Sequence, residues 1–205
     1  MPANSVKRVL KVPSDEQPTA KQTSVTLMPP RRSSVIARAM RLSDETIRQI
    51  ELGGQLHDLG KIGVREDVLN KPGKLTPAEY EHIMTHPVLG WRILEPLMSD
   101  APIALNVVRS HHERVDGRGV PDRLSGDAIP LEARIVAVAD ALDAMMSGRP
   151  YRGEEMQLED ALAELTGNCD SQFDRAVVDA TLRALDAGDL QLIPHGANVH
   201  AQVSL

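Results

Sequence analysis

The sequence predicts an all-α protein, and three observations support this fold class. Apolar residues recur at helical spacing in several segments, such as Ile47, Ile50 and Leu56. No segment shows the alternation of apolar and polar residues that is typical of strands, and no strand–helix–strand rhythm is present. Aromatic residues make up only 2% of the chain, so aliphatic residues and Met must fill the core of a helical bundle.

The chain of 205 residues is long enough for one domain with tails. Residues 1–33 are rich in Pro, Ser, Thr and Lys and contain few apolar residues, so we expect a disordered, basic N-terminal tail. The helical patterns place the domain at 34–187. Residues 188–205 lack such a pattern, and we expect an irregular C-terminal tail there.

The charge and the cysteine content indicate which partners and which compartment the protein suits. The net charge is −6 although residues 1–33 hold six basic and two acidic residues, so the body is acidic. An acidic body is a poor surface for a nucleic-acid polymer but suits a site that gathers divalent cations. The single Cys169 excludes an intramolecular disulfide and fits a reducing compartment. With no apolar run of membrane-spanning length and no apolar signal core, we expect a cytoplasmic protein without a membrane partner.

The first helices are predicted from their caps. Ser33 and Ser34 could cap a short helix that runs to Arg41. Ser43 is a stronger cap, because two acidic residues follow it in the first turn, where the helix dipole favours negative charge. This second helix delivers His57 and Asp58 at its end, where Gly60 and Gly63 terminate it.

The later helices follow from caps, breaks and apolar runs. Thr76 and Pro77 begin a helix that reaches about Thr85, and His86-Pro87 then breaks the chain and starts the next helix. Further helices are expected over 101–112, 131–147, 154–166 and 174–186, with a long loop rich in Gly and Asp at 113–130. Asp140 lies within the strongly apolar helix 131–147, where a carboxylate is costly unless it is paired or bound to metal.

Six side chains at helix ends, at breaks or in apolar surroundings form a predicted metal site: His57, Asp58, His86, His111, His112 and Asp140. Six nitrogen and oxygen ligands without a thiolate are too many for one tetrahedral zinc. They suit two divalent ions of octahedral preference, such as iron or manganese, with one carboxylate bridging. Two such ions fit the hydrolysis of a phosphodiester. Lys61, three residues after Asp58, returns to the same side of the helix if the turn continues that far.

Each of these residues also has an ordinary reading by itself. A histidine at a helix end, such as His86, is usually a capping or surface residue. Asp140 could pair with Arg134 or Arg149 instead of a metal. The joint pattern of six residues favours the metal site.

Several motifs in collinear order over residues 42–187 together resemble the HD-GYP family, a branch of the HD superfamily of metal-dependent phosphohydrolases. The motifs are His57-Asp58-Leu59-Gly60-Lys61-Ile62-Gly63, Lys71-Pro72-Gly73-Lys74-Leu75-Thr76, His86-Pro87, His111-His112-Glu113-Arg114, Ile129-Pro130-Leu131-Glu132-Ala133-Arg134-Ile135 and Arg149-Pro150-Tyr151-Arg152. The resemblance implies an HD-type helical bundle around a site of two or three metal ions. It also implies hydrolysis of the bacterial second messenger cyclic di-GMP to pGpG or GMP.

The resemblance assigns a role to each site residue. His57, Asp58, His86, His111, His112 and Asp140 fall on metal ligands, with Asp58 as the bridging one. Lys61 falls on a lysine near the scissile phosphate. Arg149 and Arg152 fall on a basic pair that binds the phosphate or guanine of the substrate, with arginine in place of a frequent lysine at the second position, which keeps the charge and adds a planar fork.

The chain departs from the family pattern in two places. The Gly-Tyr-Pro motif reads Gly119-Val120-Pro121, and valine cannot replace the stacking of a phenol. Family members also carry a ligand histidine on a helix before the His-Asp pair, but no histidine precedes His57 here. We expect residues 28–34 not to form a continuous helix, and the first helix of the bundle to be missing or replaced. One of the two metal ions is therefore expected to bind weakly.

Three functional hypotheses follow. The first is a metal-dependent cyclic di-GMP phosphodiesterase, weakened by the absent ligand. The second is a catalytically degenerate module that binds nucleotide or docks to proteins with a diguanylate-cyclase domain. The third is an HD phosphohydrolase that acts on another cyclic dinucleotide or nucleotide phosphate.

Overall fold

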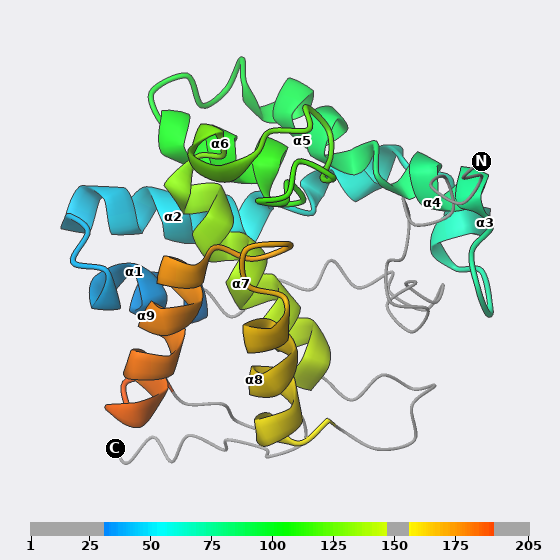
Figure 1. Ribbon diagram of the computed structural model, residues 1–205. Helices are drawn as coiled ribbons and strands as arrows, with labels where there is room; N and C mark the ends of the chain where they lie inside the picture. The colour runs from blue at the N-terminus through cyan, green and yellow to red at the C-terminus, as the bar shows by residue number, and fades with distance from the viewer. Residues whose placement is uncertain (1–30, 147–155, 191–205) are drawn as a thin grey trace, which may run out of the picture.

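The computed structural model describes residues 31–146 and 156–190 (Figure 1). These residues fold into helices, and their only strand-like contacts are isolated bridges in two loops, Asp116 with Ser125 and Cys169 with Phe173. The predicted all-α class is confirmed. No described helix combines the length and the apolar character needed to cross a bilayer.

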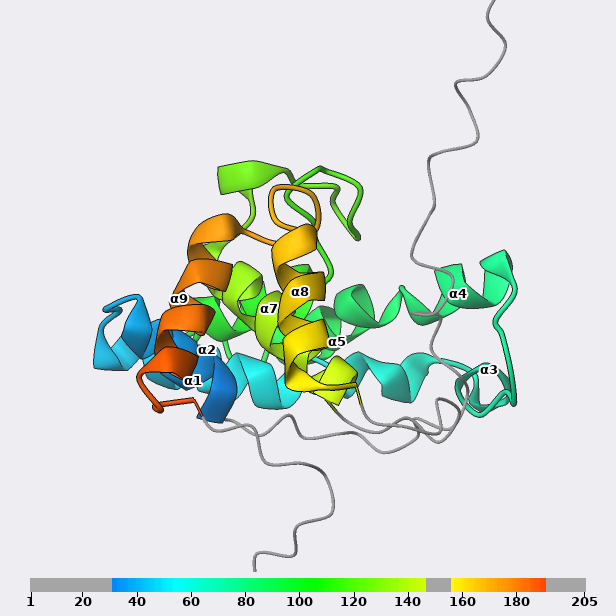
Figure 2. The ribbon, with the colours of Figure 1, turned by 60° about the horizontal axis from the view of Figure 1, so that its bottom comes forward.

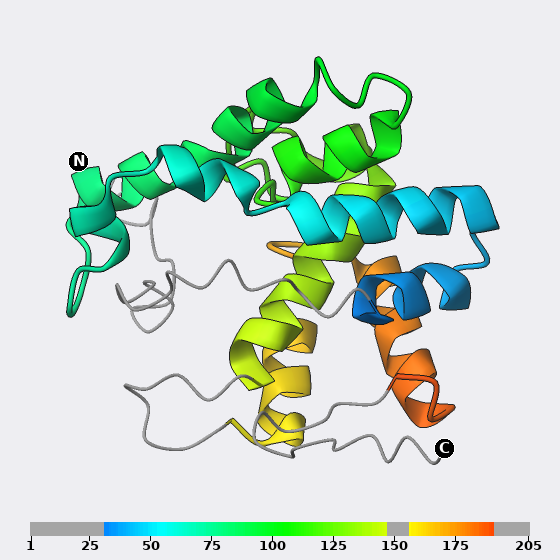
Figure 3. The ribbon, with the colours of Figure 1, turned by 180° about the vertical axis from the view of Figure 1, so that it is seen from behind.

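The helices come in this order: α1 (Arg31–Ala39), α2 (Asp44–Leu56), the 3₁₀ helix η1 (Leu59–Gly63), α3 (Glu66–Leu69), α4 (Pro77–Ile83), α5 (His86–Leu94), α6 (Pro102–Ser110), the 3₁₀ helix η2 (Gly126–Ala128), α7 (Leu131–Met146), α8 (Leu158–Gly167) and α9 (Arg175–Asp186). Helix α7 runs through the middle of the bundle and contacts α1, α2, α6, α8 and α9. Figure 2 shows α8 and α9 side by side next to α7, and Figure 3 shows α1, α2 and α6 from behind.

The position of α7 follows from its sequence. Apolar residues cover most of its circumference, and a helix of this kind has to be buried on several sides. Its Ile135, Val136 and Leu142 are fully buried, and they belong to a core that also draws on α1, α2, α6, α8 and α9. Helices α3 and α4 instead form an extension at one end of the molecule with a small apolar cluster of its own, Val64, Val68, Leu75 and Ile83 (Figure 1).

The capping predictions for α2 and α4 are confirmed. The Ser43 side chain accepts a hydrogen bond from the Thr46 backbone N–H. Thr76 and Glu79 form a reciprocal capping box, in which each side chain bonds the backbone of the other residue. The hydrogen bond from Lys71 and those from Thr76 lower the pKa of Glu79 to about 2. The caps therefore define the first residues of α2 and α4. They thereby set the number of residues between each helix start and the histidine that follows it, His57 or His86.

The first helix corrects one expectation. The short helix expected up to Arg41 is present as α1, but it begins at Arg31, so Ser33 and Ser34 lie inside it and not at its cap. Residues 31–34 are therefore helical, although we expected no continuous helix over 28–34. Pro29 and Pro30 misled the prediction, because proline before or at the first turn is compatible with a helix start. Residues 28–30 lie outside the described residues. Helix α1 buries Ile36 and Ala37 and packs on α2, α7 and α9.

A buried ion pair joins the first turn of α1 to the last turns of α7. The Arg32 guanidinium pairs with the Asp143 carboxylate, and the two side chains are only 11% and 12% exposed. Burial lowers the pKa of Arg32, because it disfavours the charged guanidinium. The pair links the helix that enters the bundle to the helix that carries Asp140.

Removal of the Asp143 carboxylate should leave the Arg32 charge buried without a partner. We therefore expect Asp143→Ala to lower the free energy of unfolding by about 3–5 kcal/mol. Urea unfolding followed by circular dichroism measures this. The double variant Arg32→Met/Asp143→Ala should regain part of the loss, and a double variant less stable than the single one would contradict the ion-pair interpretation.

Candidate metal centre

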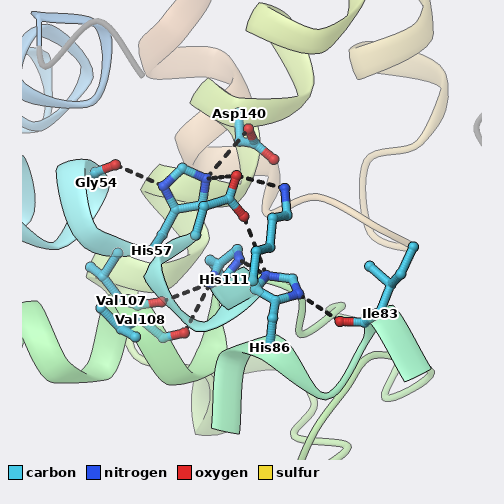
Figure 4. Close-up of polar contacts among 10 residues, drawn as sticks. Gly54, His57, Ile83, His86, Val107, Val108, His111 and Asp140 are labelled. Carbon is cyan, nitrogen blue, oxygen red and sulfur yellow. Dashed lines mark hydrogen bonds and ion pairs between the residues drawn. The ribbon is translucent and has the colours of Figure 1, made fainter. Parts of the chain in front are cut away.

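The six predicted ligands come from four separate parts of the chain and meet at one place. His57 caps the C-terminus of α2 and Asp58 follows it, His86 begins α5, His111 and His112 follow α6, and Asp140 lies on α7. Ligand atoms of His57, Asp58 and His111 lie within 4.8 Å of one another, as do those of His86, His111 and His112. Asp140 joins the first group, with its Oδ1 3.8 Å from Nε2 of His57 (Figure 4).

The Asp58 carboxylate lies between the two groups. Its Oδ2 is 3.5 Å from Nε2 of His57, and its Oδ1 is 3.4 Å from Nε2 of His86. Oδ2 also accepts a hydrogen bond of 2.7 Å from Nζ of Lys61. Each oxygen therefore faces a different imidazole, which is the arrangement that a carboxylate shared by two ions requires.

Three of the histidines are oriented by backbone carbonyls. In each, Nδ1 lies at hydrogen-bond distance from carbonyl oxygens three or four residues earlier: His57 from Gly54 (2.7 Å), His86 from Ile83 (2.8 Å), and His111 from Val107 and Val108 (both 3.1 Å) (Figure 4). A carbonyl can only accept, so Nδ1 is assigned as the donor and the lone pair of Nε2 is left free. The Nε2 atoms of His86 and His111 converge to 3.3 Å. Hydrogen bonds of this kind orient metal-binding histidines.

The protonation states suit metal binding. Burial by itself raises the pKa of Asp58, but electrostatic interactions with His57, Lys61 and His86, together with the hydrogen bond from Lys61, outweigh it and hold that pKa well below its usual value. Burial lowers the pKa of His86 to about 4 and the pKa values of His111 and His112 well below the usual value. These groups present a carboxylate and neutral imidazoles at neutral pH, the forms that bind divalent ions. The donor set and its orientation therefore fit such ions.

Gly60 allows η1 to approach α5 closely. A Cβ atom at this position would collide with the backbone carbonyl of His86 and the backbone nitrogen of Gly90. The absence of a side chain therefore lets the segment after Asp58 lie directly against the helix that begins with His86. The sequence marked Gly60 only as a helix terminator.

The structure treats the predicted arginines and the upstream helix as follows. Arg149 and Arg152 lie outside the described residues. Arg134, the alternative partner of Asp140, pairs with Asp127 and Asp174 instead. Within the described part of the chain, neither ligand group includes a residue of α1.

Val120 contacts one ligand group through its backbone, because its N–H donates a hydrogen bond of 3.1 Å to the carbonyl of His112. It lines an open cavity of about 620 Å³ together with Pro121, Gly63 and residues of α4 and α5. This cavity is mostly apolar, with Met84, Val88 and Leu89 among its lining residues. The Gly-Val-Pro segment therefore contributes to a surface beside the ligand cluster.

Sequence reasoning missed Glu113. Its side chain is buried and its carboxylate accepts hydrogen bonds from the backbone N–H groups of Asp122 (2.6 Å) and Leu124 (3.1 Å). The acidic residue directly after His111-His112 was a possible signal of this role in the sequence. Its hydrogen-bond partners are nine and eleven residues away, so the sequence did not reveal them.

Gly60→Ala should force η1 away from α5, because both clashing groups are backbone atoms. We expect the ligands of the two segments to separate and the affinity for Mn²⁺ to fall roughly 10- to 100-fold, as for other changes around metal ligands. Isothermal titration calorimetry measures this affinity. Gly73→Ala serves as the control: a Cβ there meets no other atom, although its positive φ adds some strain. Equal affinities for Gly60→Ala and the wild type would contradict the prediction.

The low pKa of His86 also predicts how the metal-free protein responds to pH. The unfolded chain binds a proton at this histidine near its usual pKa of about 6.5, whereas the folded protein binds it only near pH 4. Between these values the unfolded state holds more protons, so the free energy of unfolding should fall as the pH falls from about 6.5 towards 4. Urea titrations in EDTA at several pH values measure this slope. His86→Gln should reduce it, and an unchanged slope would show that His86 is not the source.

Comparisons with known proteins agree with this fold and site. A model of the HD domain family matches residues 14–177. The chain is 45% identical over 152 residues to the cyclic di-GMP phosphodiesterase response regulator RpfG of Xanthomonas campestris pv. campestris, which covers 74% of this chain and 40% of the relative. It is 34% identical over 168 residues to the 3'3'-cGAMP-specific phosphodiesterase 3 of Vibrio cholerae, covering 81% of this chain and 36% of the relative.

A solved structure shares the fold. Bd1817 of Bdellovibrio bacteriovorus, described as an HDG"Y"P protein, superposes with a TM-score of 0.62 at 20% identity, covering 80% of this chain and 54% of that chain. This chain spans about two fifths or less of the two sequence relatives. The family model covers most of the sequence, and the helical bundle, the His57-Asp58 pair and the converging histidines agree with it. The chain belongs to the HD domain family.

Proposed function

We propose that this protein is a metal-dependent phosphodiesterase that hydrolyses cyclic di-GMP. The position of Asp58 carries the proposal, because its two oxygens face His57 and His86 and so divide the ligands into two groups. Two divalent ions side by side are the arrangement that serves in-line displacement at phosphorus. The name of the relative from Xanthomonas supports the substrate.

We assign the metal ligands as His57, Asp58, His86, His111, His112 and Asp140, and propose two ions, iron or manganese. When bound, the ions would supply Lewis acidity that activates water and stabilises charge on the phosphate. Asp58 would bridge the ions. The oxygen and nitrogen donors, with no thiolate among them, support iron or manganese over a structural zinc.

Lys61 is proposed to act at the phosphate. Its ammonium group bonds Asp58 at the edge of the ligand cluster, and its side chain is 22% exposed. A cation at this place would stabilise the negative charge that develops on the phosphate oxygens. Arg149 and Arg152 are proposed to bind the phosphate or guanine of the substrate, as the resemblance to HD-GYP proteins implies.

A different cyclic dinucleotide is the alternative substrate. The relative from Vibrio cholerae is named as specific for 3'3'-cGAMP, so both substrate types occur among the relatives. The metal site would serve either substrate, because both contain the same scissile bond type. Competition between cyclic di-GMP and 3'3'-cGAMP in one hydrolysis assay separates the two.

A degenerate module remains the second candidate, and two observations favour it. Helix α1 adds no residue to the two ligand groups, and Val120 stands where the family has tyrosine. Such a module would bind nucleotide without turnover or dock to a protein with a diguanylate-cyclase domain. In either case we propose a cytoplasmic location, which the single cysteine supports.

Asp58→Asn tests the enzymatic proposal. The amide should lose the bridging charge, so we expect kcat/KM for cyclic di-GMP with Mn²⁺ to fall by about 100-fold or more. Asp67→Asn is the matched control, because Asp67 is exposed and its ion-pair partner among the described residues is the exposed Arg65. Equal, background turnover in the wild type and Asp58→Asn would refute hydrolysis, and tight nucleotide binding without turnover would favour the degenerate module.

A further inference from the structure

His112 differs from the other three histidines of the cluster. Within residues 31–146 and 156–190, its ring makes no hydrogen bond to a backbone carbonyl, and it packs against the rings of His111 and His86, with centroids 4.2 and 5.0 Å away. Its ring orientation therefore depends on its backbone position and on these two neighbouring rings. The backbone carbonyl of His112 accepts a hydrogen bond of 3.1 Å from the Val120 N–H. The loop that follows the two histidines thus holds His112 directly.

Glu113 holds the same loop from inside. Its buried carboxylate accepts hydrogen bonds from the backbone N–H groups of Asp122 and Leu124, which follow Val120 in the same loop. Gly119 lets the loop lie against this residue, because a Cβ there would come within 2.5 Å of Cα of Glu113. Outside the loop, Arg109 of α6 binds Asp122 with two hydrogen bonds of 2.8 Å.

We propose that Glu113 is a positioning residue for the ligand group of His86, His111 and His112. The loop from Arg114 to Ser125 does for His112 what a carbonyl does for each of the other three histidines. Glu113 fixes the loop, the loop fixes the backbone of His112 through Val120, and this backbone sets the direction of the imidazole. This inference rests on the proposed metal site.

Glu113→Gln tests the inference with little change in shape. A glutamine offers one acceptor oxygen, so one of the two backbone N–H groups would face an amide donor and lose its bond. We expect the ion held by the His86 group to bind roughly 10- to 100-fold more weakly, and the ion held by the His57 group to bind as in the wild type. Titration with Co²⁺, followed by visible absorption and by metal content after dialysis, measures both affinities.

Two further variants keep the test sharp. Glu132→Gln is the matched control, because this substitution makes the same change of charge at the start of α7, where Glu132 accepts a hydrogen bond from Asn106. The Glu132→Gln protein should bind both ions as the wild type does. Gly119→Ala displaces the loop while Glu113 stays intact, and it should weaken the same ion. Circular dichroism shows whether each variant is folded before the metal is added.

The outcomes separate the inference from the proposed function. A wild type that binds no metal refutes the proposed metal site itself. Wild-type affinities in Glu113→Gln, or an equal loss of both ions, overturn the role of Glu113 while the metal site stands. A folded Gly119→Ala that keeps both ions also overturns it, because the loop would then not control His112. Selective loss in both variants supports it.

Discussion

The buried carboxylate of Asp58 is the constraint around which the structure is arranged. Burial disfavours its charge, and the groups around it, chiefly His57, Lys61 and His86, restore it. A buried charge is tolerated only when such partners are fixed in place. The end of α2, the short η1 helix and the beginning of α5 therefore have to meet at one point, and Gly60 removes the side chain that would keep them apart. The remaining helices form the core that holds these ends together.

The histidines stand at helix ends for a shared physical reason. The last carbonyls of a helix have no N–H partner within the helix, so they can accept a bond from a side chain that follows. His57 and His111 use carbonyls of their own preceding helix (for His111, that of Val108), and His86 uses one from the end of α4. Each tether points the other ring nitrogen at the centre. The ligand geometry is thereby built into the secondary structure.

Much of this arrangement could be predicted from the sequence, because caps and ligands are local signals. Ser43, Thr76 and the His86-Pro87 break placed three helix boundaries, and the four histidines were found because they fall at such boundaries. A short helix up to Arg41 was expected, but its start at Arg31 was not, because a proline pair looks the same whether it breaks a helix or precedes one. Glu113 and the pair of Arg32 with Asp143 were missed, since their partners lie far away in the sequence and only the folded chain brings them together.

The tether on His111 has a consequence for the order of loading. His111 belongs to both ligand groups, but its Nδ1 is engaged by carbonyls and only one lone pair remains. One lone pair serves one ion at a time. If the ion beside His86 and His112 takes it, the other ion keeps His57, Asp58 and Asp140 alone. In the proposed two-ion site the two positions would then be unequal, so the centre would fill stepwise, and the position with fewer ligands would be the more sensitive to the supply of metal in the cell.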